Sequence, residues 1–281
     1  MIKKATVLLS TILLLFSIPS FSSGFVQTGS APQLRTLRDI EECLLPSVTN
    51  ALILGDTANI SYLDIAACEE YGKLGFKKWN HLKYDLFLMA YKGYLVMKKE
   101  NYISNDRYLT VMDFELSSTQ RRLWVLDLEK HKVVLHDLVS HGRNSGEEYA
   151  VSFSNKPESF KSSLGFYVTA EPYIGKNDYS LRLHGVEAGF NDNAFDRGIV
   201  MHGADYVSHR YIRGNNRLGR SQGCPAVSPK IARWLIDVIQ GGSCLFIYYP
   251  DKKYLAQSEI LNADDPAKEL FLNTGYALNL P

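Results

Sequence analysis

The sequence predicts a mainly β fold with a few helices, an α+β arrangement preceded by a helical N-terminal region. Short runs rich in Val, Leu and aromatic residues recur over residues 108–249, and clusters of Gly, Asn, Asp and Pro separate them, as is typical of strands joined by turns. Before residue 106 the apolar residues recur at spacings of three and four, the period of a helix. The chain has 281 residues, 46% of them hydrophobic, so it can bury a large core.

The first 22 residues have the layout of a secretory signal peptide. Lys3 and Lys4 precede an apolar run over residues 5–18, and small residues follow. The run is shorter than a comfortable membrane span. We therefore expect cleavage near residue 22, a periplasmic or secreted protein, and no stable insertion into a membrane. An uncleaved anchor is the alternative.

The charge balance gives no reason to expect nucleic acid or an anionic membrane as a partner. Loss of Lys3 and Lys4 with the signal leaves 29 of the 31 basic side chains against 30 acidic ones, a formal charge of −1. The sequence does not indicate an oligomeric state.

Residues 23–105 are predicted as the helical N-terminal region. An apolar stripe over residues 34–44 ends at Pro46, and Ser61 with Asp64 offers a capping box for the next helix. A second stripe consists of Leu82, Leu86, Ala90 and Leu95. We expect these helices to pack on the β domain, residues 106–251.

The β domain is predicted from seven apolar runs and one helix. The runs are Tyr108–Phe114, Arg122–Leu128, Lys132–Val139, Phe166–Thr169, Ser180–Leu183, Gly198–His202 and Cys244–Tyr249. The second and third are joined around residues 129–131 as a hairpin. The helix begins with Ser228 as N-cap and Pro229 in its first turn, and ends before Gly241. Residues 252–281 are predicted as a polar C-terminal tail.

The strongest chemical signal is a histidine and a cysteine separated by a polar loop. His202 ends an apolar strand, and Cys224 follows Ser221-Gln-Gly. A cysteine is a strong nucleophile only as thiolate, which is a few per cent of the molecules near neutrality at a pKa of about 8.5. An adjacent imidazole is expected to lower this pKa by about two units and to act as general base. A structural core residue is the alternative for His202 considered alone.

Two glycines accompany this pair. Gly223 allows a sharp turn before Cys224, so backbone N–H groups there are expected to face a developing oxyanion. Gly203 follows His202 directly. A second His-Gly string begins at His141 and is expected to form a turn at a strand end.

These residues resemble the murein L,D-transpeptidase catalytic domain family (YkuD-type), in the branch with a Ser-x-Gly-Cys-Pro-Ala motif. The likeness runs from about Tyr108 to Pro250 and includes the strings at 141–146 and 162–169. It implies a curved β-sandwich over residues 106–251 with a helix after Cys224.

The resemblance also implies an enzyme that acts on peptidoglycan stem peptides without a cofactor or a metal. Cys224 would attack a tetrapeptide stem, release D-alanine and hold a thioester, which an amine then resolves. His202 would take the thiol proton, and a backbone carbonyl near Gly203 would orient its ring.

Three positions depart from the common family motif. Gln222 stands where the family has His, which leaves His202 as the base. Pro225 and Ala226 stand where a hydrophobic residue and Arg or Asn are usual, so recognition of a substrate carboxylate must move elsewhere. The candidates by position are Arg213, Arg217 and Arg220, because a guanidinium binds a carboxylate with two hydrogen bonds. Ser221 is a further candidate for substrate binding. A solvated basic loop is the alternative for each arginine.

Other interpretations stay open. Water as acceptor would make the protein an L,D-carboxypeptidase, and a disulfide on Cys224 would make it a non-catalytic cell-wall-binding module. Zinc on His184, His209 and the Cys224 pair is disfavoured because no spacing matches a compact metal site. Four tyrosines are a further candidate set, for a groove that binds a sugar or a peptide; they are Tyr173, Tyr179, Tyr206 and Tyr211. Packing on the sheet is the alternative for each.

The other three cysteines are assigned by their surroundings. Cys43 and Cys68 lie in the same N-terminal region, so an oxidising compartment is expected to pair them. Cys244 lies in a continuous apolar strand and is expected to be a small core residue.

Overall fold

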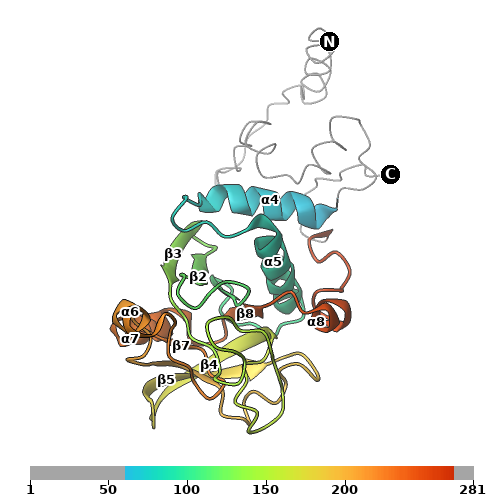
Figure 1. Ribbon diagram of the computed structural model, residues 1–281. Coiled ribbons are helices and arrows are strands. Elements are labelled where there is room, and N and C mark those ends of the chain that lie inside the picture. Colours follow the sequence, from blue (N-terminus) through green and yellow to red (C-terminus); the bar gives the residue numbers. More distant parts are fainter. Residues whose placement is uncertain (1–60, 269–281) are drawn as a thin grey trace, which may run out of the picture. The chain divides into compact units, whose positions relative to one another are not determined.

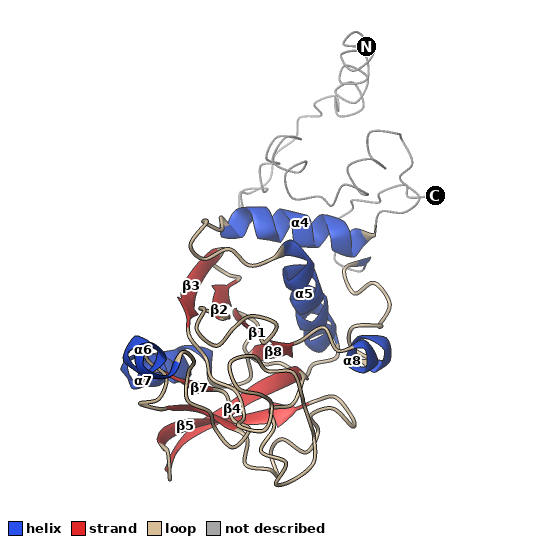
Figure 2. Cartoon of the chain, in the orientation of Figure 1, coloured by secondary structure: helices blue, strands red, loops and turns tan. Residues whose placement is uncertain are grey.

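A single mixed sheet of eight strands organises the protein (Figures 1 and 2), in the order β3-β2-β1-β8-β4-β5-β6-β7. The computed structural model describes residues 61–268. The strands are β1 (Tyr108–Asp113), β2 (Leu123–Asp127), β3 (Lys132–Asp137), β4 (Gly165–Gly175), β5 (Asp178–Gly185), β6 (Val200–Gly203), β7 (Ala226–Val227) and β8 (Cys244–Tyr248). The helices are α4 (Tyr62–Leu74), α5 (Tyr84–Lys99), α6 (His209–Asn215), α7 (Pro229–Ile239) and α8 (Lys252–Gln257). The mainly β fold class predicted from the sequence is confirmed.

The last strand lies in the middle of the sheet. β8 pairs in parallel with β1 on one side and antiparallel with β4 on the other. All five of its residues are buried, which explains the continuous apolar run, because a strand covered on both faces needs no alternation. Cys244 is fully buried there, with its sulfur 3.5 Å from the sulfur of Met97, as expected for a core residue.

Local signals place the ends of two helices as predicted. Ser61 and Asp64 form the capping box of α4, with the Ser61 hydroxyl accepting from the Asp64 amide at 3.1 Å. α7 follows Ser228 and stops before Gly241, whose φ is +76°. Ser228 makes no side-chain capping hydrogen bond, so Pro229 in the first turn is the effective start signal.

One hydrophobic core joins α4 and α5 to the sheet. The rings of Phe166 on β4 and Phe246 on β8 stack at 4.1 Å. Gly93 lets α5 approach this stack, because a Cβ at that position would lie 2.0 Å from the Phe166 ring. The helices therefore pack directly on the sheet.

The region predicted as a polar tail differs from the expectation at its start. α8 lies in this region, and Tyr254 within it is fully buried. The Tyr254 hydroxyl donates to buried Glu187 at 2.9 Å, and the Ser258 hydroxyl also donates to that carboxylate. A six-residue helix anchored by one aromatic ring leaves no periodic stripe, which is why the pattern did not reveal it.

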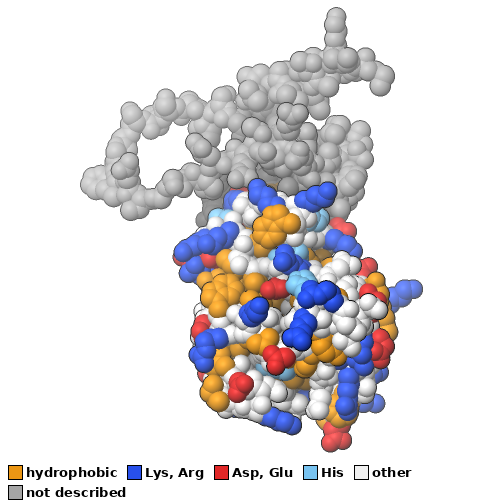
Figure 3. Space-filling model, turned by 60° about the vertical axis from the view of Figure 1, so that its left-hand side comes forward, with side chains coloured by type: hydrophobic (Ala, Val, Ile, Leu, Met, Phe, Trp, Pro, Cys, Tyr) orange, Lys and Arg blue, Asp and Glu red, His pale blue; other side chains and the backbone are white. Residues whose placement is uncertain are grey.

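The described surface carries mixed charges. Figure 3 shows basic, acidic and hydrophobic side chains interspersed over one face, which matches the formal charge of +1 for the whole chain. Within residues 61–268 no helix combines the length and apolarity needed to cross a membrane. The signal peptide, the stripe at 34–44, Cys43 and residues 269–281 lie outside the described residues, so the pairing of Cys43 with Cys68 stays a prediction.

Candidate active site

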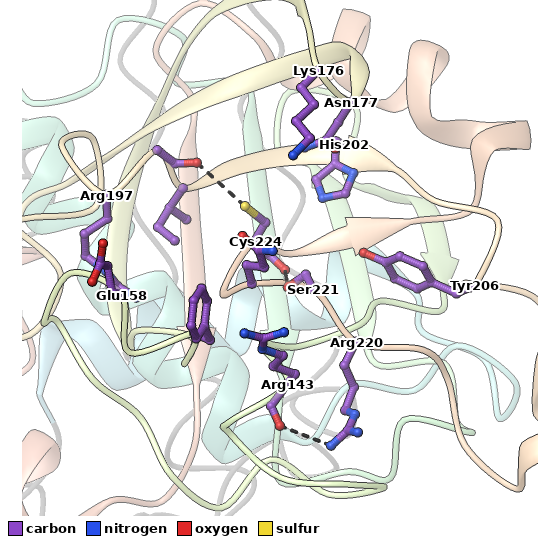
Figure 4. Close-up of a pocket in the computed structure, with 14 residues that line it drawn as sticks. Arg143, Glu158, Lys176, Asn177, Arg197, His202, Tyr206, Arg220, Ser221 and Cys224 are labelled. Carbon is purple, nitrogen blue, oxygen red and sulfur yellow. Dashed lines mark hydrogen bonds between the residues drawn. The ribbon is translucent and has the colours of Figure 1, made fainter.

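Two neighbouring strands bring together the histidine and the cysteine singled out from the sequence. β6 and β7 pair in parallel, with His202 opposite Ala226. Cys224 precedes Ala226 by two residues and therefore lies beside Val200, whose amide donates to the Cys224 sulfur at 3.5 Å. The side chains of His202 and Cys224 consequently line the same cavity (Figure 4).

The cavity measures about 610 Å³, a size typical of a site for a small ligand. Besides the pair, its lining contains charged and aromatic side chains from distant segments. They include Arg143, Glu158, Phe160, Lys176, Arg197, Tyr206 and Arg220.

The His202 ring is held so that one nitrogen stays available. Its Nδ1 lies 3.0 Å from the carbonyl oxygen of Gly203. A carbonyl only accepts, so Nδ1 carries the hydrogen and Nε2 of the neutral ring keeps its lone pair. Burial lowers the pKa of His202 below its ordinary 6.5, and the Gly203 carbonyl partly offsets this. The imidazole is therefore a neutral base near neutrality.

Burial favours the protonated form of the Cys224 thiol. It is 9% exposed, and its sulfur donates to the Gly198 carbonyl at 3.7 Å. Burial raises the pKa of this thiol, while the Val200 amide and the charge of Arg197 oppose that rise. The expectation that His202 lowers this pKa was wrong, because loss of hydration outweighs the groups that favour the thiolate. The pKa directions thus favour a protonated thiol and a neutral imidazole in the lining of one cavity.

Ser221 and Gly223 shape the turn that carries the thiol. The Ser221 hydroxyl donates to the Cys224 carbonyl at 2.6 Å and accepts from the Gly223 amide at 3.0 Å. Gly223 has φ +123°, and a Cβ there would lie 2.9 Å from the Lys161 carbonyl oxygen. The Gly223 N–H is thus occupied within the loop, and the Ser221 hydroxyl is engaged there too. These hydrogen bonds hold the turn itself, and Ser221 also lines the cavity. An oxyanion contact from backbone N–H groups around Cys224 and a substrate contact at Ser221 stay predictions.

Only one of the three predicted arginines lines the cavity. Arg220 does, but its guanidinium pairs with Glu147 at 2.6 Å. Arg217 pairs with the same carboxylate at 3.0 Å, and Arg213 is exposed on α6; neither is part of the lining. Nearness to Cys224 along the chain therefore does not bring Arg213 or Arg217 into the lining.

The sequence interpretation missed Arg197. Its guanidinium donates to the carbonyls of Ser154 at 2.8 Å and Lys161 at 2.7 Å, and to the hydroxyls of Ser159 and Ser163. It therefore fastens the loop at 154–163 to the start of β6. Its position immediately before the predicted strand that delivers the histidine was the one available signal.

Of the four tyrosines proposed for a groove, Tyr206 lines the cavity. Burial raises its pKa to about 12, so it stays a neutral phenol. Tyr179 lines a second, separate hollow, and its hydroxyl donates to Asp237 at 2.6 Å.

His141 contacts the nucleophile loop, residues 221–224, which carries Cys224. Arg122 donates to its Nδ1 at 2.8 Å, and its Nε2 donates to the Gly146 carbonyl at 3.3 Å. The His141 carbonyl accepts from the Ser221 amide at 3.0 Å. Burial, with the charge of Arg122, lowers the His141 pKa to about 3. Both ring nitrogens are engaged, which fits the structural role expected from the sequence.

His184 and His209, the other two histidines considered as zinc ligands, have other positions in the fold. The His184 ring stacks on Phe195 at 4.6 Å, and His209 begins α6. Among residues 61–268 no group of three or more His, Cys, Asp or Glu side chains is placed to hold a metal ion.

The family model described as the L,D-transpeptidase catalytic domain matches residues 78–248. The chain belongs to this family. The match begins ahead of α5, whereas the sequence pattern suggested a likeness starting near Tyr108. No functionally curated protein matches the chain.

Solved structures of L,D-transpeptidases are also similar. The L,D-transpeptidase from Mycobacterium smegmatis is 15% identical, over 51% of this chain and 59% of that one, with a TM-score of 0.33. L,D-transpeptidase 3 from Mycobacterium tuberculosis is 13% identical, over 51% and 61%, with a TM-score of 0.32. The enzyme from Xylanimonas cellulosilytica is 16% identical, over 64% and 90%, with a TM-score of 0.29. The match thus spans about three fifths of the length of the two mycobacterial chains.

Proposed function

We propose that the protein is an exported murein L,D-transpeptidase, a cysteine acyltransferase that acts on peptidoglycan. The observation that carries this proposal is the pair of Cys224 and His202 in one cavity, with the Nδ1 hydrogen of His202 held by the Gly203 carbonyl. Such an arrangement presents a nucleophile and a base whose accepting nitrogen is Nε2. Export is supported by the basic and apolar pattern of the first 22 residues.

In the first step the Cys224 sulfur attacks the carbonyl that precedes the terminal D-alanine of a tetrapeptide stem. His202 Nε2 takes the thiol proton and returns it to the amine of D-alanine as the carbon–nitrogen bond breaks. The stem remains attached to the sulfur as a thioester. An amine of a neighbouring stem then attacks this thioester, His202 accepts the amine proton, and the thiol is restored. One amide bond is broken and another is formed, so the cycle needs no ATP.

A protonated Cys224 thiol and a neutral His202 imidazole suit this order of reaction steps. Burial keeps the thiol protonated until a substrate is present, since it disfavours the anion. Arg197 lowers the thiol pKa through its charge and therefore favours the thiolate when the proton moves to His202. General-base transfer of this kind contributes about 10² to 10⁴ in rate.

Two alternatives follow from the same site. With water as acceptor the protein is an L,D-carboxypeptidase, and the thioester is common to both reactions. The binding-module alternative requires Cys224 to be locked in a disulfide, and Cys224 is a free thiol in the structure. The free thiol favours an enzyme.

Incubation of the purified protein with disaccharide tetrapeptide tests the proposal. Release of D-alanine with formation of cross-linked dimer supports the transferase, and tripeptide alone supports the hydrolase. Carbapenem β-lactams should add to the wild type and not to C224A, as seen by mass spectrometry. Absence of both turnover and adduct under reducing conditions would reject the proposal.

A further inference from the structure

The cavity beside Cys224 carries four cationic side chains and one carboxylate, that of Glu158. Two of the cations are committed elsewhere. Arg197 donates to oxygens of the loop at 154–163, and Arg220 pairs with Glu147. In Figure 4 the Arg220 guanidinium points away from Cys224. The cations that remain for a ligand are Arg143 and Lys176.

The Arg143 guanidinium is held in position without using its own hydrogen-bond donors. Its guanidinium carbon lies 4.0 Å from the centre of the Phe160 ring, in a cation–π contact. Its amide donates to the Ser221 carbonyl at 2.8 Å, which ties it to the nucleophile loop. In the described part of the chain its guanidinium has no hydrogen bond or ion pair, and Figure 4 shows it pointing toward Cys224.

Backbone contacts fix the position of Phe160, on whose ring the Arg143 guanidinium stacks. Phe160 has φ +53°, a left-handed backbone that a bulky residue rarely adopts. Its carbonyl accepts from the Asn144 amide at 3.1 Å. Gly142 allows this approach, because a Cβ there would lie 2.5 Å from the same carbonyl oxygen. The segment at 142–144 therefore fixes the ring on which the Arg143 guanidinium rests.

We propose that Arg143, stacked on Phe160, is the site that binds a carboxylate of the acyl donor; this rests on the proposed function. The ligand is a carboxylate of the tetrapeptide stem, either on the terminal D-alanine or on the side chain of the diamino acid. A planar guanidinium binds a carboxylate through two parallel hydrogen bonds, and stacking orients it beforehand at little cost in entropy. Lys176, on the β4–β5 turn, offers a point charge without that geometry.

Three synthetic tetrapeptides test this proposal: the free acid, the C-terminal amide and the side-chain amide of the diamino acid. In wild type, amidation of the bound carboxylate should lower kcat/KM by about 100-fold, the scale of a lost charge-assisted pair of hydrogen bonds. R143Q should lower kcat/KM for the free acid by a similar factor. For the peptide in which the bound carboxylate is amidated, the kcat/KM of R143Q should stay within about threefold of the wild-type value. R143K should fall between, because it keeps the charge without the fork. R210Q, an exposed arginine on α6, is the matched control and should behave as wild type.

An equal loss for all three peptides in R143Q, or an unchanged preference for the free acid, would overturn the proposal. If wild type turns over no stem at all, the proposed function has failed and the binding site is tested separately. Calorimetry on C224A then decides it: tighter binding of the free acid than of one amide, lost in R143Q, supports the carboxylate site. Equal affinities for the three peptides reject it.

Discussion

His141 and His202 are both buried, both precede a glycine and both lie next to the nucleophile loop, yet they have opposite chemistry. They are 1% and 5% exposed. His141 has a partner on each ring nitrogen, whereas only Nδ1 of His202 has a hydrogen-bond partner among the described residues. Burial therefore does not distinguish the two rings. The availability of the second ring nitrogen does, and it supports His202 as the base of the proposed reaction.

The surroundings of each ring explain the contrast. Arg122 is fully buried behind His141, and its pKa is lowered to about 9, so it remains charged near neutrality. That charge and three further hydrogen bonds to backbone carbonyls fix it as a donor to His141. His202 instead faces the cavity that holds the Cys224 sulfur. One histidine is part of the scaffold, and the other is open to a reactant.

The largest expected difference between the two histidines is in the acylation rate after each is replaced by glutamine. His202→Gln should lower the rate of thioester formation by about 10³, because a general base is lost. His141→Gln should lower it by less than about tenfold, because the glutamine amide can still accept from Arg122 and donate to Gly146. Rapid-quench mass spectrometry of the acyl-enzyme measures both. Comparable losses in the two variants would remove the distinction.

Stability should respond in the reverse order. His141→Leu leaves one N–H of the fully buried Arg122 guanidinium without a partner, which should cost about 2 kcal/mol in the free energy of unfolding, whereas the Gly146 carbonyl keeps its hydrogen bond from Arg220. His202→Leu frees only the Gly203 carbonyl at the cavity wall, so its cost should stay below about 1 kcal/mol. Urea denaturation followed by circular dichroism gives both values. A larger loss for His202→Leu would contradict this assignment.

The hydroxyl of Ser221 links the scaffold to the nucleophile and should have a smaller effect on turnover. Ser221→Ala removes the contacts to Gly223 and Cys224, so the thiol is positioned less well and kcat should fall by about tenfold with little change in KM. Ser208→Ala is the control, because it removes the cap of α6 outside the cavity and should leave kcat unchanged. Steady-state kinetics on the tetrapeptide checks this, and a rise in KM alone would instead indicate a substrate contact.

The pH profile should show the smallest effect. The pKa of His202 is lowered below 6.5, so more than half of the rings are neutral bases at pH 6.5. Wild-type acylation at pH 6.5 should therefore exceed half of its plateau and decline only at lower pH. An acid limb with its midpoint at or above pH 6.5 would show that His202 is not the neutral base described above.

The elements that the sequence predicted well are those specified by residues close together in the chain. The capping box at Ser61, the Pro229 start of α7 and the buried run of β8 each depend on a few neighbouring residues. The pair of His202 and Cys224 was also recognised locally, because both belong to one motif. α8 and the two-residue strand β7 were missed, since neither is long enough to establish a period.

The carboxylate site could not be found in this way. Arg143 and Phe160 lie more than 60 residues before Cys224, and a cation–π contact leaves no spacing in the sequence. Arg213 and Arg217 were predicted from their nearness to Cys224 along the chain. In the structure neither lines the cavity, and Arg217 pairs with Glu147. Only folding shows which of many arginines keeps its donors for a ligand.

Residue types and short-range order were enough to recognise the family, the mainly β class and the thiol and imidazole of the candidate pair. Three features depend on tertiary contacts: the direction in which burial shifts the thiol pKa, the availability of the second imidazole nitrogen and the selection of Arg143 among the cations. Desolvation and hydrogen-bond partners are set by groups from distant segments, and no pattern along the chain records which of them meet.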